Sequence, residues 1–119
     1  MNWKIDKNRA ICPQLCEQLC AHIAAGAFLP GQRLMSVRDV AVAAGVNPNT
    51  VQRAFEQLEQ QGVLRSERGS GWYVTANTDA AHQVREKIIH QKIDAFFREM
   101  NSLGMSDAQI KQVVKEWNP

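Results

Sequence analysis

Side chains that can hydrogen-bond to the edges of DNA bases gather between positions 47 and 53 of this chain. They are Asn47, Asn49, Thr50, Gln52 and Arg53. Asn and Gln can form paired hydrogen bonds with adenine, Arg can do so with guanine, and Thr can contact the methyl group of thymine. These residue types at the start of a helix are typical of a surface that enters the major groove of DNA.

A short helix and a tight turn are predicted directly upstream. Ser36 can cap the helix start, and Asp39 places a carboxylate in the first turn, where it complements the helix dipole. Apolar residues recur at helical spacing, namely Val37, Val40, Ala41 and Ala44. Gly45 tolerates the left-handed backbone of a tight helix exit, so a turn is expected there, with Val46 buried between two helices. Arg38 is placed to reach a phosphate or an adjacent base.

A second helix is predicted to begin at once and to present the polar group to solvent. Asn47 is a good N-cap, and Pro48 fits the first helical position, where no hydrogen bond is lost. The core face of this helix is expected to comprise Val51, Ala54, Phe55 and Leu58. Gly62 ends the helix. Two capped helices joined by a tight turn predict a helix-turn-helix.

A glycine-tipped hairpin is predicted after the second helix. Residues 63–66 and 72–75 read as two strands that bracket a tip at residues 67–71. Glycines let the backbone of the tip approach DNA closely, and Arg68 is aimed at phosphates or a narrow minor groove. The DNA-contacting candidates of the hairpin are Arg65, Arg68, Gly69, Ser70 and Gly71. Trp72 either contacts DNA or covers the core, and the second interpretation is favoured.

The N-terminal part is expected to support this unit. Residues 3–5 are predicted to form a short strand that pairs with the hairpin, and a helix is predicted over about residues 11–25. The helix carries Cys12, Cys16 and Cys20 at four-residue steps on one face. They could form a thiol sensor or a soft-metal site, but three thiols of one helix do not converge easily on one ion. Packing as small apolar residues in a reducing cytosol is favoured.

Two more helices are predicted beyond a polar connector at Thr75–Thr78. The first runs from Asp79 to about Leu103, and Ser106 with Gln109 forms a capping box for the second. Their apolar faces hold Val84, Ile88, Ile89, Ile93, Phe96, Phe97, Met100, Ile110, Val113, Val114 and Trp117. Some forty residues cannot bury so much apolar surface alone, so a second copy of the chain is predicted to cover it. The dimer would set two recognition helices about one duplex turn apart, or a small multiple of it.

Two alternatives on the first of these helices stay open. His82, Glu86, His90 and Asp94 follow one another at four-residue steps and could hold a metal ion where two copies meet. A solvated face with i,i+4 charge pairs is favoured, so no metal site and no cofactor are assigned. The aromatic pair at positions 96 and 97 could border an effector pocket, although core packing is favoured. A small-molecule effector therefore stays unidentified.

Length and charge agree with a small, mainly α protein that carries a β-hairpin, an α+β architecture. The 119 residues suit a DNA-binding domain at 1–75 and a helical dimerisation module at 76–119. The net charge of +2 lies in residues 1–75, which hold eight Lys or Arg against six Asp or Glu. Such a modest excess of positive charge favours DNA binding through contacts at specific positions over binding by a surface that is basic throughout. No apolar run could span a membrane and residues 1–4 start no secretory signal, so a cytoplasmic location is expected.

Three segments closely resemble the GntR family of bacterial transcription regulators. They are the runs LPGQRLMSVR at 29–38, VNPNTVQRAF at 46–55 and RGSGWYV at 68–74. The second is similar to the YtrA-like subfamily in particular. The resemblance covers about residues 3–75, and the short remainder also fits the small helical dimerisation module of that subfamily. It implies a homodimeric repressor on a palindromic operator, often over its own operon and often beside genes for an ABC transporter.

The family pattern transfers to some positions only. Arg38 matches the DNA-contacting arginine of the family, and Thr50 matches a residue of its recognition helix. Pro48 and Gln52 stand where other branches carry arginines, so the base-reading rules of those branches do not apply. Trp72 replaces the small Thr that is usual in the wing, the hairpin of this fold.

Three classes of function follow from these residues. The first is a sequence-specific repressor that blocks RNA polymerase until an undisclosed signal relieves it, although activation from the same fold stays open. The second is a module for protein contact only, for which losing Arg38, Arg53 and Arg68 would leave nucleic-acid affinity unchanged. The third, an enzyme, is not expected, because the sequence holds no nucleophile elbow, phosphate loop or separated metal-ligand cluster. The repressor is the function predicted here.

Overall fold

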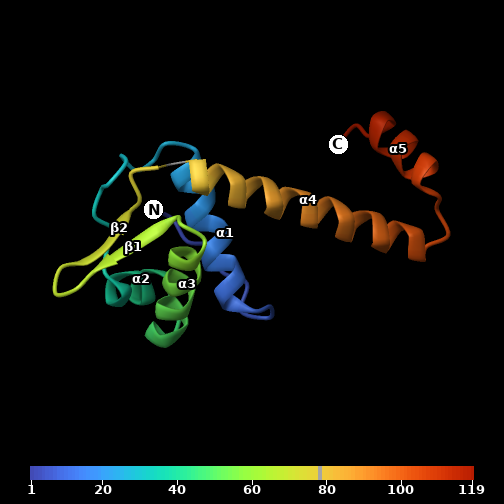
Figure 1. Cartoon of the computed structure of the whole chain (residues 1–119). Helices are drawn as coiled ribbons and strands as arrows, with labels where there is room; N and C mark the ends of the chain where they lie inside the picture. Colours follow the sequence, from blue (N-terminus) through green and yellow to red (C-terminus); the bar gives the residue numbers. More distant parts are fainter. Residues whose placement is uncertain (78) are drawn as a thin grey trace. The chain divides into compact units, whose positions relative to one another are not determined.

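The computed structural model describes residues 1–77 and 79–119 (Figure 1). Within these residues the elements are α1 (Ile11–Ala24), α2 (Val37–Ala44), α3 (Pro48–Gln60), β1 (Leu64–Glu67), β2 (Gly71–Val74), α4 (Asp79–Ser102) and α5 (Asp107–Glu116). The prediction of a mainly α fold with a small β-hairpin is confirmed. Thr78, the last residue of the predicted connector, lies outside the described residues. Contacts divide the chain within α4, into the units Met1–Arg85 and Glu86–Pro119.

The core of the first unit lies largely between α1 and α3, which pack against each other (Figure 1). From α1 it takes the leucine and isoleucine stripe at Leu15, Leu19 and Ile23. From α3 it takes all four predicted residues, Val51, Ala54, Phe55 and Leu58, none more than 1 % exposed. Full burial of one large apolar side chain stabilises a fold by about 1.5–3 kcal/mol. This packing therefore fixes the orientation of α3 and leaves its opposite face to solvent.

The turn between α2 and α3 is built as its residues predict. Ser36 Oγ accepts a hydrogen bond from Asp39 N at 3.1 Å, which caps the start of α2. Gly45 ends α2 with φ +68°, a conformation that costs little without a Cβ. Asn47 Oδ1 then accepts a hydrogen bond from Asn49 N at 2.8 Å and caps α3. Val46 is half-buried against the core, so the turn is held from both sides.

The wing has a third backbone segment along one edge. β1 and β2 pair antiparallel, with Leu64 opposite Val74 and Glu67 opposite Gly71. Beyond β2, Leu34 N donates to Trp72 O at 2.8 Å and Val74 N donates to Gln32 O at 2.8 Å. A bridge between Arg33 and Tyr73 lies at the same place. The linker between α1 and α2 therefore completes the sheet.

The predicted strand at residues 3–5 is wrong. This segment has no strand conformation, and its backbone bonds to side chains of α1 instead. Lys4 N donates to Gln18 Oε1 at 3.0 Å, and Lys4 O accepts from Gln18 Nε2 at 2.7 Å. The outer edge of β2 is already occupied by the segment around Arg33. Glutamine side chains thus satisfy the backbone groups that a sheet was expected to satisfy.

The first turns of α4 belong to the first unit. Ala81 is buried, and Ala80 and Val84 pack against the core of that unit. Val84 was expected on the dimer face. Instead, its apolar side chain packs against the core of its own chain. None of the helices in the described residues is long and apolar enough to cross a membrane.

The second unit consists of the remainder of α4 and the whole of α5. Ser106 Oγ accepts from Gln109 N at 3.2 Å, and Gln109 Oε1 accepts from Ser106 N at 2.8 Å, so the predicted capping box is confirmed. Ile110 is fully buried, and the rings of Phe96 and Phe97 meet edge to face at 6.1 Å. Large apolar side chains nevertheless stay exposed at Ile93, Phe96, Leu103, Val113, Val114 and Trp117. This unit leaves an apolar face uncovered.

The cysteines of α1 are free thiols that face the core to different extents. Cys16 and Cys20 are buried, whereas Cys12 is half-buried. Burial, with the neighbouring thiols as a smaller cause, raises the pKa of Cys16 to about 12, and burial raises the pKa of Cys20 to about 11. Cys16 Sγ donates to Ala54 O of α3 at 3.6 Å. These surroundings agree with the favoured interpretation that Cys16 and Cys20 are packing residues.

Candidate nucleic-acid interface

The predicted base-contacting residues share the exposed face of α3 near its N-terminus. Asn49 and Arg53 are exposed, whereas Thr50 and Gln52 are half-buried. Arg53 Nη2 donates to Thr50 Oγ1 at 3.4 Å, and Gln52 Nε2 donates to Glu56 Oε1 at 2.9 Å. Because Thr50 is neutral, its contact leaves the charge of Arg53 available to a ligand. Thr50 and Arg53, and likewise Gln52 and Glu56, are thus paired along their own helix.

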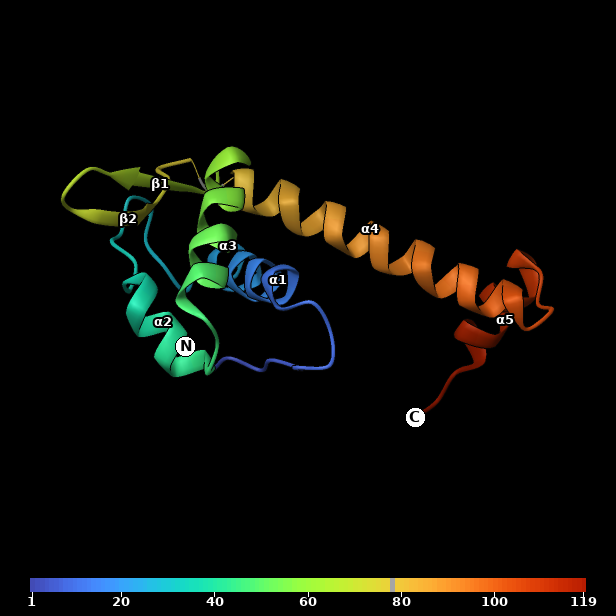
Figure 2. The same cartoon turned by 90° about the horizontal axis from the view of Figure 1, so that it is seen from below.

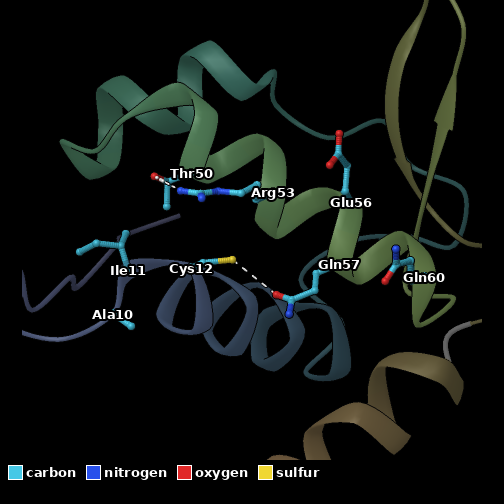
Figure 3. Close-up of a pocket in the computed structure, with 8 residues that line it drawn as sticks. All are labelled: Ala10, Ile11, Cys12, Thr50, Arg53, Glu56, Gln57 and Gln60. Atoms are coloured by element: carbon cyan, nitrogen blue, oxygen red, sulfur yellow. Dashed lines mark hydrogen bonds between the residues drawn. The ribbon is translucent and has the colours of Figure 1, made fainter.

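A groove of about 570 Å³ runs between this face of α3 and the start of α1 (Figure 3). It is lined by Ala10, Ile11, Cys12, Thr50, Arg53, Glu56, Gln57 and Gln60. On one wall, Cys12 Sγ donates to Gln57 Oε1 at 3.4 Å. Figure 3 shows Arg53 and Thr50 lying together at one end of the groove. The groove places the arginine beside the start of α1, where helix amides favour anions.

The arginines of α2 and the wing tip carry unneutralised charge. Arg38 and Arg68 are both exposed, and no ion pair in the described residues involves either of them. Arg65 differs, because it pairs with Glu67 and lies over the ring of Tyr73 at 4.7 Å. The wing therefore offers a free cation at its tip and a compensated one in β1.

The wing tip adopts a backbone that requires glycine. Gly69 has φ +76° and Gly71 has φ +129°, a region that side chains with a Cβ rarely enter. Ser70 N donates to Glu67 O at 3.0 Å, which closes the turn, and the hydroxyls of Ser70 and Tyr73 hydrogen-bond to each other. The tip is thus a tight, ordered turn with little side-chain bulk.

Trp72 faces the core. It is half-buried, and its ring meets that of Phe55 edge to face at 5.4 Å. Such aromatic pairs contribute about 0.5–1.5 kcal/mol beyond their burial. The favoured interpretation of Trp72, as a strand residue that covers the core, agrees with this contact.

Two residues that position the wing were not identified from the sequence. Glu59 Oε2, at the end of α3, accepts from Ser66 N at 2.8 Å and from Ser66 Oγ at 2.7 Å. These hydrogen bonds, the side-chain one first, hold the pKa of Glu59 below its usual value. No capping or periodicity pattern in the sequence indicates the contact between Glu59 and Ser66, since seven residues separate them. The wing is therefore tied directly to the recognition helix.

Arg33 is a further cation of the wing that the predicted set of contact residues omits. Its Nε and Nη2 lie 3.4 Å from the position that a Cβ at Gly71 would take. Its guanidinium thus lies against the wing where Gly71 leaves room. Arg33 lies in the 29–38 run that resembles the GntR family, and this position is the sequence signal that could have identified it. Only the sheet bridge between Arg33 and Tyr73 brings that run to the wing.

The candidate metal ligands on α4, which are His82, Glu86, His90 and Asp94, are all exposed. His90 Nε2 lies 4.0 Å from Glu86 Oε2, the i,i+4 pair that the favoured interpretation predicts. Among residues 1–77 and 79–119, no three His, Cys, Asp or Glu side chains gather closely enough to hold a metal ion. His82 and Asp94 take part in no ion pair within that part of the chain.

Comparison with known proteins shows the family to which this chain belongs. The model of the family described as bacterial regulatory proteins, gntR family, matches residues 13–74. The chain belongs to the GntR family. It is 31 % identical over 112 residues to the HTH-type transcriptional repressor YtrA of Bacillus subtilis, covering 89 % of this chain and 82 % of YtrA. It is also 26 % identical to the regulator YhcF of the same organism, over 97 % of this chain and 95 % of YhcF.

A solved structure extends the likeness to nearly the whole chain. A GntR-family transcriptional regulator from Listeria monocytogenes superposes with a TM-score of 0.79 at 32 % identity, covering 96 % of this chain and 100 % of that one. The chain is therefore a DNA-binding transcription regulator of YtrA-like type, and it is not an enzyme.

Proposed function

We propose that this GntR-family regulator is a homodimeric repressor that binds a palindromic operator through α3 and the wing of each copy. The observation that carries the proposal is the exposed face of α3 near its N-terminus, where Asn49, Thr50 and Arg53 gather while the opposite face is locked into the core. Rigid placement matters, because base contacts lose specificity when side chains are loosely held. The wing, tied to α3 through Glu59 and Ser66, extends the same surface.

The residues divide by role in this proposal. Asn49, Thr50 and Arg53 lie at base edges or nearby phosphates, and Asn47 and Gln52 flank them. The backbone contacts are assigned to Arg38 and Arg65, and the wing contacts to Arg68, Gly69, Ser70 and Gly71. Arg65 would have to exchange Glu67 for a phosphate, so we expect it to contribute less than the unpaired arginines.

A second copy is proposed to cover the apolar face of residues 86–119. Leu103 is 76 % exposed and Trp117 is 70 % exposed, which is unusual for isolated surface residues of this size. An apolar hollow of about 350 Å³ lies among Phe96, Met100, Val113, Val114 and Trp117. Side chains of the partner copy would fill it. Ile88, Ile89, Ile93 and Phe97 complete the proposed interface. Ile110 was also expected there, but it is fully buried within its own chain and leaves no surface for a partner.

The family resemblance supports the proposed regulatory role. The YtrA relative is a repressor by name. The resemblance implies a repressor that often controls its own operon, often beside genes for an ABC transporter. Operator occupancy would block RNA polymerase until an unidentified signal, such as a small-molecule effector, releases the protein. The protein would act in the cytoplasm, where it meets the chromosome.

Selection from a random duplex pool tests this proposal. The protein should enrich one palindromic sequence, because two copies read two half-sites. Light scattering should give twice the chain mass, and Ile93→Glu should shift it toward the single-chain mass, whereas the control Gln91→Glu on the same helix should not. No enrichment would contradict sequence-specific binding, and enrichment of a single unrepeated half-site would contradict the dimer.

A further inference from the structure

The segment that precedes α1 is held in a defined place by two glutamines. Gln14 Oε1 accepts from Asp6 N at 2.8 Å, and Gln14 Nε2 donates to Asp6 O at 2.8 Å. Gln18 makes the same double contact with the backbone of Lys4. Gln14 is only 5 % exposed, and it is the single polar side chain among the buried residues described. In each pair, one glutamine amide accepts from the backbone N–H of a residue and donates to the carbonyl of the same residue, as a neighbouring strand does in a β-sheet. The backbone of residues 4–6 is therefore fixed on α1.

This anchoring brings Lys7 to the turn of the helix-turn-helix. Lys7 Nζ lies 3.4 Å from the position that a Cβ at Gly45 would take. In Figure 2 the segment passes close to the turn between α2 and α3 before it reaches α1. Two residues after Gly45, Asn47 caps the start of α3. The ammonium group therefore lies next to the end of α3 that is proposed to enter the major groove.

The charge of Lys7 is not compensated by its surroundings. The adjacent carboxylate, Asp6, accepts from Arg9 Nε at 3.2 Å and from Asn8 N at 2.9 Å. Of the ion pairs in the part of the chain that the structure describes, none includes Lys7. A cation fixed beside a groove-binding helix, with its neighbouring acid already paired, suits a DNA phosphate.

We propose that residues 4–9 form an N-terminal arm that binds the DNA backbone through Lys7, beside the half-site read by α3. The inference rests on the proposed operator binding. A purely structural role is the alternative, since an ammonium at the C-terminus of α2 also stabilises that helix through its dipole. The two roles differ in the salt dependence of DNA binding, which a helix cap does not change.

Lys7→Gln tests the arm against a matched control in the same segment. Lys4→Gln removes the same charge three residues away, where Lys4 lines a groove with Asn2, Gln18 and His22. Affinity for a labelled duplex from upstream of the protein's gene is measured from 50 to 300 mM salt, with thermal unfolding as the check on folding. One phosphate contact contributes about 0.9 to the slope of log K against log salt. In a dimer, Lys7→Gln should lower the slope by about 1.8 and weaken binding about ten- to thirtyfold at 0.15 M salt.

The outcomes separate the arm from the proposed function. Lys4→Gln and Lys7→Arg should keep the wild-type slope. A Lys7→Gln variant with a lower melting temperature but an unchanged slope would reduce Lys7 to a helix cap and overturn the inference, while leaving the repressor proposal in place. Wild-type protein that binds no duplex in a salt-dependent manner would overturn both.

Discussion

The contact between Glu59 and Ser66 should make the wing sensitive to pH. Glu59 accepts two hydrogen bonds from Ser66, and both end on the same carboxylate oxygen. Hydrogen bonds to a charged group are worth about 1.5–3 kcal/mol when buried, but solvent screens an exposed carboxylate strongly. Because Glu59 is exposed, we expect Glu59→Gln to lower the free energy of unfolding by only about 0.5–1 kcal/mol at pH 7.

The sign of the pH dependence follows from the direction of the pKa shift. Folding lowers the pKa of Glu59, so its stabilisation is present above the pKa of the unfolded chain, near 4.3 for Glu. The stabilisation is lost as the pH falls through the lower, folded-state pKa. The difference in unfolding free energy between wild type and Glu59→Gln should therefore be constant from pH 8 to about pH 5 and shrink as the pH falls further, through the folded-state pKa.

Urea unfolding from pH 3 to pH 8 measures this difference. Glu56→Gln is the control, since Glu56 lies one turn earlier on the same helix and bonds to Gln52 of that helix, not to the wing. It should cost less and change little with pH. A difference for Glu59→Gln that is absent at pH 7, or that grows as the pH falls, would refute the reasoning.

Three further results are expected. Arg53→Ala should weaken operator binding by about 1–3 kcal/mol and change the preferred sequence. The melting temperature should stay unchanged, because Arg53 is exposed and hydrogen-bonds to Thr50, a neutral neighbour on its own helix. Titration of matched and single-mismatch duplexes checks this, and a lower melting temperature with unaltered preference would count against a base contact. Gly45→Ala should lower stability by about 1–2 kcal/mol in chemical denaturation, because its φ of +68° disfavours a Cβ. At pH 8 a thiol reagent should label the half-buried Cys12 first, while Cys16 and Cys20, with pKa values near 12 and 11, should react only on unfolding; rapid labelling of all three in the native protein would contradict their burial.

Local hydrogen-bond chemistry explains what the sequence could predict. The caps at Ser36, Asn47 and Ser106 are confirmed, because each oxygen bonds to an amide two or three residues away. The buried stripe of α3 is confirmed as well, since helical spacing alone brings its members to one face. Such features depend on short separations in the chain and therefore show in the residue pattern.

Contacts between distant segments account for what the sequence could not predict. The segment around Lys4 was expected to pair with the wing, but the side chain of Gln18, fourteen residues away, bonds to its backbone. Arg33 was overlooked because only the sheet bridge to Tyr73 brings it beside Gly71. No periodicity or capping signal reports either contact.

Fluorescence anisotropy on DNA from upstream of the protein's own gene is the most direct test of sequence-specific operator binding, on which the proposed repression depends. The protein is titrated at fixed salt into this labelled duplex and into a shuffled duplex of equal composition. The account predicts tight binding to the first duplex alone, with two chains per site and an affinity that falls steeply as salt rises. Equal and weak binding to both duplexes would contradict control of its own operon through a specific operator.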